Sequence, residues 1–144
     1  MRIIGGVLKR RKLYFPKTRM TRPVTDRTKE TIFNVLGMLC ESVTVLDLFA
    51  GSGSLGIEAL SRGAKEVWFV DSAQAATSCI ARNLKTLMLE SSAHILQMPV
   101  FEALKRLENQ GEKFNLIFMD PPYNKGLIKK VLHRIDHSDI VTPY

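Results

Sequence analysis

The chain has 144 residues, 45% of them hydrophobic, and a formal net charge of +7. This length suits one domain with its own core, and no apolar run approaches the roughly 18 residues that would span a bilayer. The early basic residues are not followed by the apolar core of a signal peptide, so we expect a cytoplasmic protein. Cys40 and Cys79 fall in apolar helical patterns and are expected to be buried free thiols. The three histidines are scattered, and the sequence predicts no metal site.

The N-terminal segment carries the whole excess of positive charge. Residues 1–30 hold ten Lys and Arg against two acidic residues, whereas the rest of the chain is nearly neutral. A local excess of this kind is typical of a polyanion partner, although a basic arm that only aids solubility is an alternative. An anionic membrane is disfavoured because the segment lacks an amphipathic helical stripe. We expect residues 1–25 to form a basic arm with a hairpin over 2–15. The residues expected to contact phosphates are Arg10, Arg11, Lys12, Arg19, Arg22 and Arg27.

From Asp26 onward, helices and strands are predicted to alternate. The first helix has Asp26 as its expected N-cap and continues at helical spacing to Leu39. Apolar patterns then predict strands over 43–48, 66–71, 93–97 and 114–119, and helices over 55–62, 74–88, 101–109 and 126–134. This alternation predicts an α/β fold, a mostly parallel sheet with helices on both faces. In such a sheet, ligands bind outside the carboxyl ends of the strands.

A glycine-rich turn follows the first predicted strand. Gly51, Gly53 and Gly56 have the Gly-x-Gly-x-x-Gly spacing between a strand and a helix, which is the context in which this motif binds nucleotides. Gly51 and Gly53 are expected to let the backbone approach a ligand, and Gly56 to let the helix pack closely on the sheet. Asp71 ends the next strand, twenty positions after Gly51, where its carboxylate can accept both ribose hydroxyls.

The carboxylate of Asp47 argues against a dinucleotide at this turn. Asp47 stands at the end of the strand, just before the glycines, and would repel a pyrophosphate. The same carboxylate can attract a cationic ammonium or sulfonium group. S-adenosylmethionine, which has a ribose, an adenine and a cationic tail but no phosphate, therefore fits better.

A second motif, Asp120-Pro121-Pro122-Tyr123, follows the last predicted strand. It offers a carboxylate, a stiff backbone with free carbonyls and an aromatic ring. These groups suit a flat ring that carries an exocyclic amine: the amine donates to Asp120 and to the Pro121 carbonyl, and Tyr123 stacks on the base. An ordinary proline turn is the alternative for this motif alone.

With both motifs, the chain resembles the class I S-adenosylmethionine-dependent methyltransferases that modify exocyclic amines. It most resembles the bacterial small-subunit (16S) ribosomal RNA guanine-N2 methyltransferases. The segments that carry this resemblance are 2–6, 11–13, 22–27 with Glu30, Phe33 and Asn34, 46–62 and 120–123. The resemblance runs along nearly the whole chain, and the N-terminal segments narrow it to this family.

The resemblance implies a Rossmann-like methyltransferase domain over 26–144 that acts on ribosomal RNA or the small ribosomal subunit. It implies catalytic roles for Asp120, Pro121, Pro122 and Tyr123. The cofactor contacts it implies are Asp47, Phe49, Gly51, Gly53, Gly56, Asp71, Val100 and Phe101. Related enzymes often place an Asp or Asn on the adenine amine after the third strand; here Gln97-Met98-Pro99-Val100 has neither, so adenine is expected to pack near Val100 and Phe101.

Two alternatives stay open on the sequence alone. The family continues for several tens of residues, which supply the last strands of a seven-stranded sheet, so the domain is expected to be incomplete at its C-terminal end. A chain of this kind could be an inactive RNA-binding or assembly module. The same motifs also fit a DNA methyltransferase acting on adenine N6 or cytosine N4. The oligomeric state is not predicted.

Overall fold

One parallel sheet forms the centre of the molecule. The computed structural model describes residues 1–16, 24–121 and 125–143. Within these ranges four strands lie in the order β3-β2-β1-β4, and all three pairings are parallel. The strands are β1 (Thr44–Leu48), β2 (Glu66–Asp71), β3 (Ala93–Gln97) and β4 (Leu116–Met119). They confirm the four predicted strands, with β1 beginning one residue later and β4 two residues later than expected.

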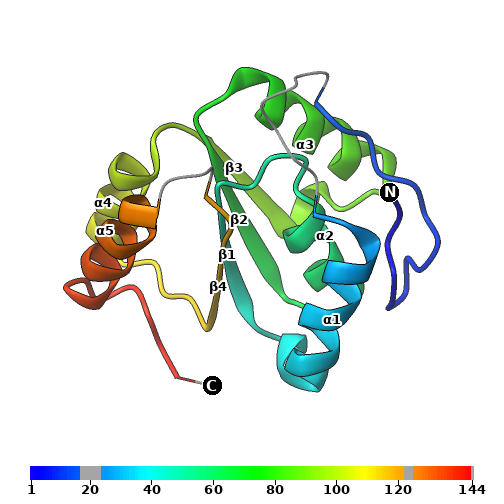
Figure 1. The fold of residues 1–144 in the computed structure, drawn as a ribbon, viewed down its shortest axis with the longest axis horizontal. Coiled ribbons are helices and arrows are strands. Elements are labelled where there is room, and N and C mark those ends of the chain that lie inside the picture. The colour runs from blue at the N-terminus through cyan, green and yellow to red at the C-terminus, as the bar shows by residue number, and fades with distance from the viewer. Residues whose placement is uncertain (17–23, 122–124, 144) are drawn as a thin grey trace.

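Helices cover both faces of this sheet, as predicted. Figure 1 shows α1, α2 and α3 on one face, and α4 and α5 on the other. Their bounds are Asp26–Leu36 for α1, Ser54–Ser61 for α2, Gln74–Thr86 for α3, Val100–Asn109 for α4 and Lys125–Asp136 for α5. Two short 3-10 helices, η1 (Gly37–Cys40) and η2 (Glu90–Ser92), follow α1 and α3. Among the described residues, no helix is long and apolar enough to cross a bilayer.

The two faces of the sheet bury two separate cores, because successive strand residues point to opposite faces. Val45, Val67 and Phe69 pack with α1, α2 and α3. Leu46 and Val70 point the other way and pack with α4 and α5. Cys40 and Cys79 are both buried and free, as predicted.

The first helix differs from its prediction at both ends. Its N-cap is Thr25, whose hydroxyl accepts a hydrogen bond from the Thr28 backbone N–H at 3.1 Å, whereas Asp26 occupies the first turn. Thr25 has the extended backbone of an N-cap residue, and the negative charge of Asp26 in the first turn interacts favourably with the helix dipole. Both residue types are therefore common at a helix start, and the sequence alone does not distinguish their positions. The helix ends at Leu36 and not at Leu39, because Gly37 takes a φ of 56°.

The N-terminal residues form the expected hairpin, reduced to a single antiparallel bridge between Arg2 and Lys12. Ile3 and Leu13 are buried in the core under α1, α2 and α3. The backbone N–H groups of Ile4 and Gly5 both donate to the Glu58 carboxylate at 2.9 Å. The described part of the arm is therefore packed on the body of the molecule.

Candidate active site

Three carboxylates stand at the carboxyl ends of neighbouring strands. Asp47 lies in β1 and Asp71 ends β2, while Asp120 directly follows β4. β1 lies between β2 and β4, and its Asp47 is in register with Phe69 and Phe118. The charges of Asp120 and Asp71 both act on Asp47. The topology therefore gathers the three predicted side chains at one edge of the sheet.

Asp47 is a buried carboxylate, only 2% exposed. Burial raises its pKa well above the ordinary value; the hydrogen bond from the Gly56 N–H at 3.0 Å opposes that rise, and the charges of Asp120 and Asp71 add to it. Within the described residues, no Lys, Arg or His forms an ion pair with it. A buried carboxylate without a cationic neighbour is costly, and a cationic ligand is the chemical group that suits it.

The glycine turn is shaped by its backbone and by packing beneath it. Gly51 has a φ of 59°, and the preceding Phe49 also has a positive φ, 56°, which is unusual for a bulky residue and typical of ligand sites. A Cβ at Gly56 would lie 2.4 Å from the Phe69 ring, so only glycine lets α2 pack this closely on β2. A Cβ at Gly53 would meet Phe69 at 3.2 Å, which ties this residue to the core as well.

Asp71 holds the turn against the end of β2. One of its carboxylate oxygens accepts from the Gly51 N–H and the other from the Ala73 N–H, both at 2.9 Å. Each carboxylate oxygen has a second lone pair, and the residue is half-buried. Asp71 can therefore still accept hydrogen bonds from the hydroxyl groups of a ligand bound at the turn.

The remaining predicted site residues are only partly described. Asp120 is exposed and Pro121 half-buried, whereas Pro122 and Tyr123 lie outside the described residues. Val100 is buried at the start of α4, and the neighbouring Phe101 is 39% exposed. An aromatic surface is thus available beside the carboxyl end of β3.

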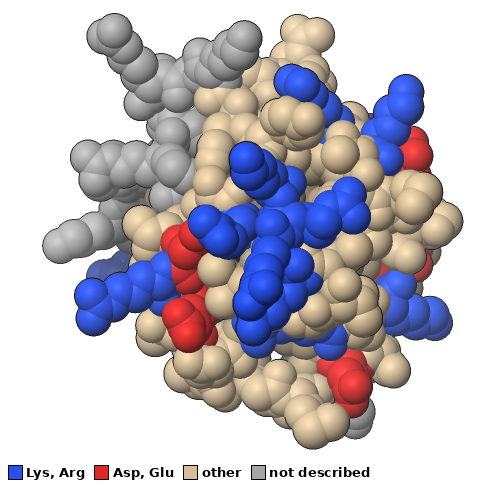
Figure 2. Space-filling model, turned by 90° about the vertical axis from the view of Figure 1, so that its right-hand side faces the viewer, with Lys and Arg blue, Asp and Glu red and all other residues tan. Residues whose placement is uncertain are grey.

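Of the six residues predicted to contact phosphates, four are described. Arg10, Arg11, Lys12 and Arg27 are all exposed, and Arg19 and Arg22 lie outside the described ranges. Figure 2 shows Lys and Arg side chains gathered across the face of the molecule that carries the arm. The four of these predicted residues that the structure describes are therefore available at the surface for a ligand to contact.

The sequence did not reveal the buried polar residues that hold the arm. Glu58 pairs with Lys29 at 3.3 Å, where both side chains are fully buried, and with Arg62 at 2.9 Å. Ser61 donates to the Gly5 carbonyl through its hydroxyl at 2.6 Å. Two signals could have indicated this cluster: Lys29 stands four positions before the buried Phe33 on one face of α1, and Glu58 lies in a helix without a polar face.

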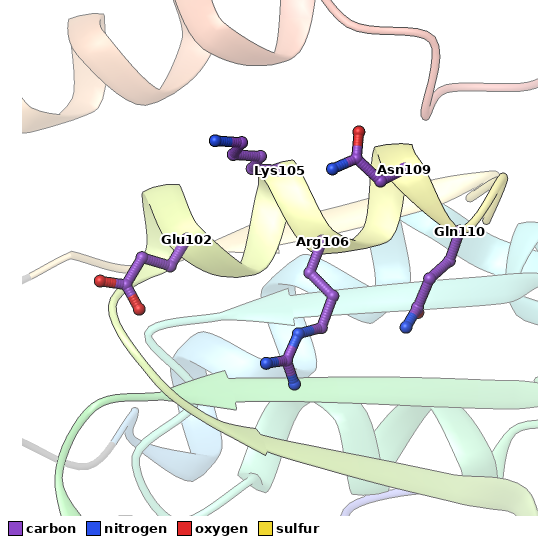
Figure 3. Close-up of a pocket in the computed structure, with 5 residues that line it drawn as sticks. All are labelled: Glu102, Lys105, Arg106, Asn109 and Gln110. Carbon is purple, nitrogen blue, oxygen red and sulfur yellow. The ribbon is translucent and has the colours of Figure 1, made fainter.

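A hollow on the face of the sheet covered by α4 and α5 is separate from the strand-end carboxylates Asp47, Asp71 and Asp120. It runs along α4 and is lined by Glu102, Lys105, Arg106, Asn109 and Gln110. Figure 3 shows Lys105 and Asn109 extending from one side of the helix and Arg106 and Gln110 from the other. None of these residues belongs to the predicted site. The described residues also contain no group of three or more His, Cys, Asp or Glu that could hold a metal ion.

The parallel sheet, the glycine turn after β1 and the acidic strand ends define a Rossmann-like class I methyltransferase. Within that class, the chain belongs to the family described as Conserved hypothetical protein 95, whose model matches residues 1–144.

Known relatives cover nearly the whole chain. A Bacillus subtilis protein named as a candidate rRNA methyltransferase is 43% identical over 98% of this chain and 77% of its own length. The Escherichia coli "Ribosomal RNA small subunit methyltransferase D" is 37% identical over 96% of this chain and 68% of its own length. A solved Escherichia coli structure described as a candidate methyltransferase superimposes with a TM-score of 0.85 at 35% identity, covering 99% of this chain and 75% of that one.

Proposed function

We propose that this chain transfers a methyl group from S-adenosylmethionine to the exocyclic N2 of a guanine in small-subunit ribosomal RNA. The observation that carries the proposal is the placement of Asp120 at a strand end beside Asp47, next to the glycine turn. The names of the B. subtilis and E. coli relatives support ribosomal RNA as the substrate. The guanine N2 acceptor rests on the sequence resemblance.

The residues at the strand ends fit S-adenosylmethionine. The spare acceptor sites of Asp71 suit two ribose hydroxyls, and the backbone at Phe49 and Gly51 has the conformation of a ligand cradle. Asp47 is buried and has no ion-pair partner among the described residues, so it suits the cationic end of the molecule, directly or through water. Val100 and Phe101 provide apolar surface for adenine. A dinucleotide also contains adenine, but the negative charge of Asp47 disfavours the pyrophosphate of a dinucleotide.

The protein's part in the reaction is to aim a weak nucleophile. Guanine N2 is weak because its lone pair is conjugated into the ring. Hydrogen bonds from its two protons to the Asp120 carboxylate and the Pro121 carbonyl turn that lone pair out of conjugation. A carboxylate is too weak a base to remove a proton from the guanine amine before the transfer. The proton therefore leaves during or after the transfer, to Asp120 or to water.

S-adenosylmethionine, held by Asp47, Asp71 and the glycine turn, would supply an electrophilic methyl group and would leave as the neutral thioether. The target base must leave its stack to reach that methyl, at a cost of a few kcal/mol. Stacking on Tyr123 offsets part of this cost. Residues 1–25, together with Arg27, bind the RNA backbone and supply affinity, while residues 26–144 perform the transfer.

The test is methyl incorporation into under-methylated small ribosomal subunits, with digestion to identify the modified base. Wild type should yield N2-methylguanine. Asp120→Ala should abolish turnover but leave binding of S-adenosylhomocysteine unchanged, and Asp139→Ala, which removes an exposed carboxylate elsewhere, should behave as wild type. Unaltered turnover in Asp120→Ala contradicts the mechanism. In a competition between ribosomal RNA and duplex DNA, methyl groups on adenine or cytosine of the DNA would favour the DNA alternative. Failure to bind the cofactor would favour a non-catalytic module.

A further inference from the structure

Tyr14 is an aromatic residue that the fold displays and does not use in its core. Its side chain is 41% exposed, whereas the preceding Leu13 is buried. Its backbone is held firmly: the Tyr14 N–H donates to the Asn83 side-chain oxygen at 2.7 Å, and the Tyr14 carbonyl accepts from the Asn83 amide at 3.0 Å. The Cys79 thiol donates to the same carbonyl at 3.1 Å. The ring is therefore presented at a fixed place without being needed for packing.

A guanidinium group covers one side of this ring. The Arg82 guanidinium carbon lies 3.6 Å from the centroid of the Tyr14 ring. Within the described ranges, no carboxylate forms an ion pair with Arg82. A tyrosine ring backed by an unpaired guanidinium is a flat, cationic surface. Such surfaces bind unstacked nucleic-acid bases through stacking and cation–π attraction.

The neighbourhood of this pair points to the same ligand. The exposed Arg10, Arg11 and Lys12 come just before Tyr14 in the chain, and the exposed Lys85 lies one turn after Arg82 on α3. Figure 2 shows Lys and Arg side chains gathered on the face that carries the arm. Phosphates attracted by such a surface bring their bases within reach of the ring.

The pair is also tied to the candidate active site. The Asn83 amide that holds Tyr14 donates a second hydrogen bond to the Ser52 carbonyl, at 3.1 Å, inside the glycine turn. Asn83 is only 1% exposed, so this link is rigid and dry. One side chain therefore fixes the ring relative to the turn on which the cofactor is proposed to sit.

We propose that Tyr14 and Arg82 form a stacking platform for an unpaired RNA base that flanks the methylated nucleotide. The proposal rests on the proposed function for the identity of the RNA. The platform holds a neighbouring base while the arm holds phosphates, and this fixes the register in which the target guanine enters. It adds a base-contacting element to an arm whose other residues contact only the backbone.

The experiment measures binding of the full chain, saturated with S-adenosylhomocysteine, to an RNA strand of about 12 nucleotides, free or annealed to its complement. Tyr14→Ala should weaken binding to the free strand about tenfold to a hundredfold, and binding to the duplex little. The slope of log affinity against log salt should stay unchanged, because no phosphate contact is lost. Tyr14→Phe keeps the ring and should bind as wild type. A 2-aminopurine placed in the strand should be quenched by wild type and Tyr14→Phe but not by Tyr14→Ala.

Two outcomes would overturn the platform: equal binding by wild type and Tyr14→Ala, or equal losses on strand and duplex together with a smaller salt slope. The backbone hydrogen bonds to Asn83 survive in Tyr14→Ala, and unchanged cofactor affinity would show that the variant is folded. The methyl-transfer assay on small subunits is scored separately. Wild-type transfer with no Tyr14 effect on binding rejects the platform alone, whereas Tyr14-dependent binding without transfer rejects the proposed function alone.

Discussion

At Asp47 the protein keeps a carboxylate where burial opposes its charge. An acid whose folded-state pKa is raised favours the folded state only while it is protonated. That contribution is fully present below the ordinary pKa of about 3.9 and is lost as the pH rises through the folded-state pKa. Ionisation of Asp47 therefore destabilises the fold, and the presence of a carboxylate at this turn is consistent with a role in binding a cation.

Replacing Asp47 with Asn should separate stability from binding. The Asn side-chain oxygen can still accept from the Gly56 N–H, and no buried charge remains. Wild type should therefore lose thermal stability relative to Asp47→Asn as the pH is raised from 4 towards neutrality. Affinity for S-adenosylmethionine should fall at least about tenfold, because a hydrogen bond to a charged group is worth roughly 1.5–3 kcal/mol. Parallel stability profiles of the two proteins across this pH range would contradict the argument.

At the scale of elements, α1, α2 and the arm meet at one buried carboxylate, Glu58. It pairs with Lys29 and Arg62 and accepts two backbone N–H groups from the arm. Burial lowers the pKa of Lys29, and the charge of Glu58 opposes that fall. The ion pair is thus a condition for keeping Lys29 charged inside the fold.

Glu58→Gln should destabilise the protein by about 3–5 kcal/mol, the usual cost of leaving a buried charge without its partner. Urea unfolding measures the loss. Without Glu58 the pKa of Lys29 falls further, and a base with a lowered pKa makes the folded state more stable as the pH rises. The deficit against wild type should therefore shrink between neutral and alkaline pH. Lys29→Met combined with Glu58→Gln should recover part of the stability; a double variant weaker than Glu58→Gln alone would show that the charge is not the cause.

The link through Asn83 between the arm and the glycine turn leads to a further prediction. Asn83→Ala removes hydrogen bonds to Tyr14 and to the Ser52 carbonyl, and each buried group left unpaired costs about 1–3 kcal/mol. Calorimetry should show weaker binding of S-adenosylhomocysteine, although Asn83 is not among the proposed ligand contacts. Cys79→Ala is the matched control, because Cys79 also bonds the Tyr14 carbonyl. Equal cofactor affinities in both variants would rule out the link.

Elements with a repeating pattern were predictable, and contacts between distant segments were not. β2 falls where its apolar run placed it, because a central parallel strand needs apolar residues on both faces. The carboxylates at the strand ends could be predicted as well, because the end of each apolar run marks the end of its strand. The partners of Glu58 lie up to 54 positions away, and no local period encodes such a contact. Thr25 and Asp26 both suit a helix start, so the cap could not be decided without the backbone.

At the scale of the whole molecule, charge is divided between two faces. The arm carries exposed Arg10 and Arg11, and α5, with exposed Lys129 and Lys130, covers the opposite face of the sheet (Figure 1). Both pairs make the same contribution to net charge. If the two pairs differ in their effect on RNA binding, net charge alone therefore cannot explain the difference, whereas a defined phosphate-binding surface on the arm can.

Reversing Arg10 and Arg11 to Glu should weaken RNA binding and also flatten its salt dependence. The slope of log affinity against log salt is negative, and each lost phosphate contact reduces its magnitude by about 0.7 for a single strand and about 0.9 for a duplex. Reversing Lys129 and Lys130 to Glu changes net charge by the same amount and should leave the slope near that of wild type. The measurement is a salt titration of binding to one RNA strand with all three proteins. Equal slopes for the two charge-reversed proteins would mean that overall charge, and not the arm, attracts the RNA.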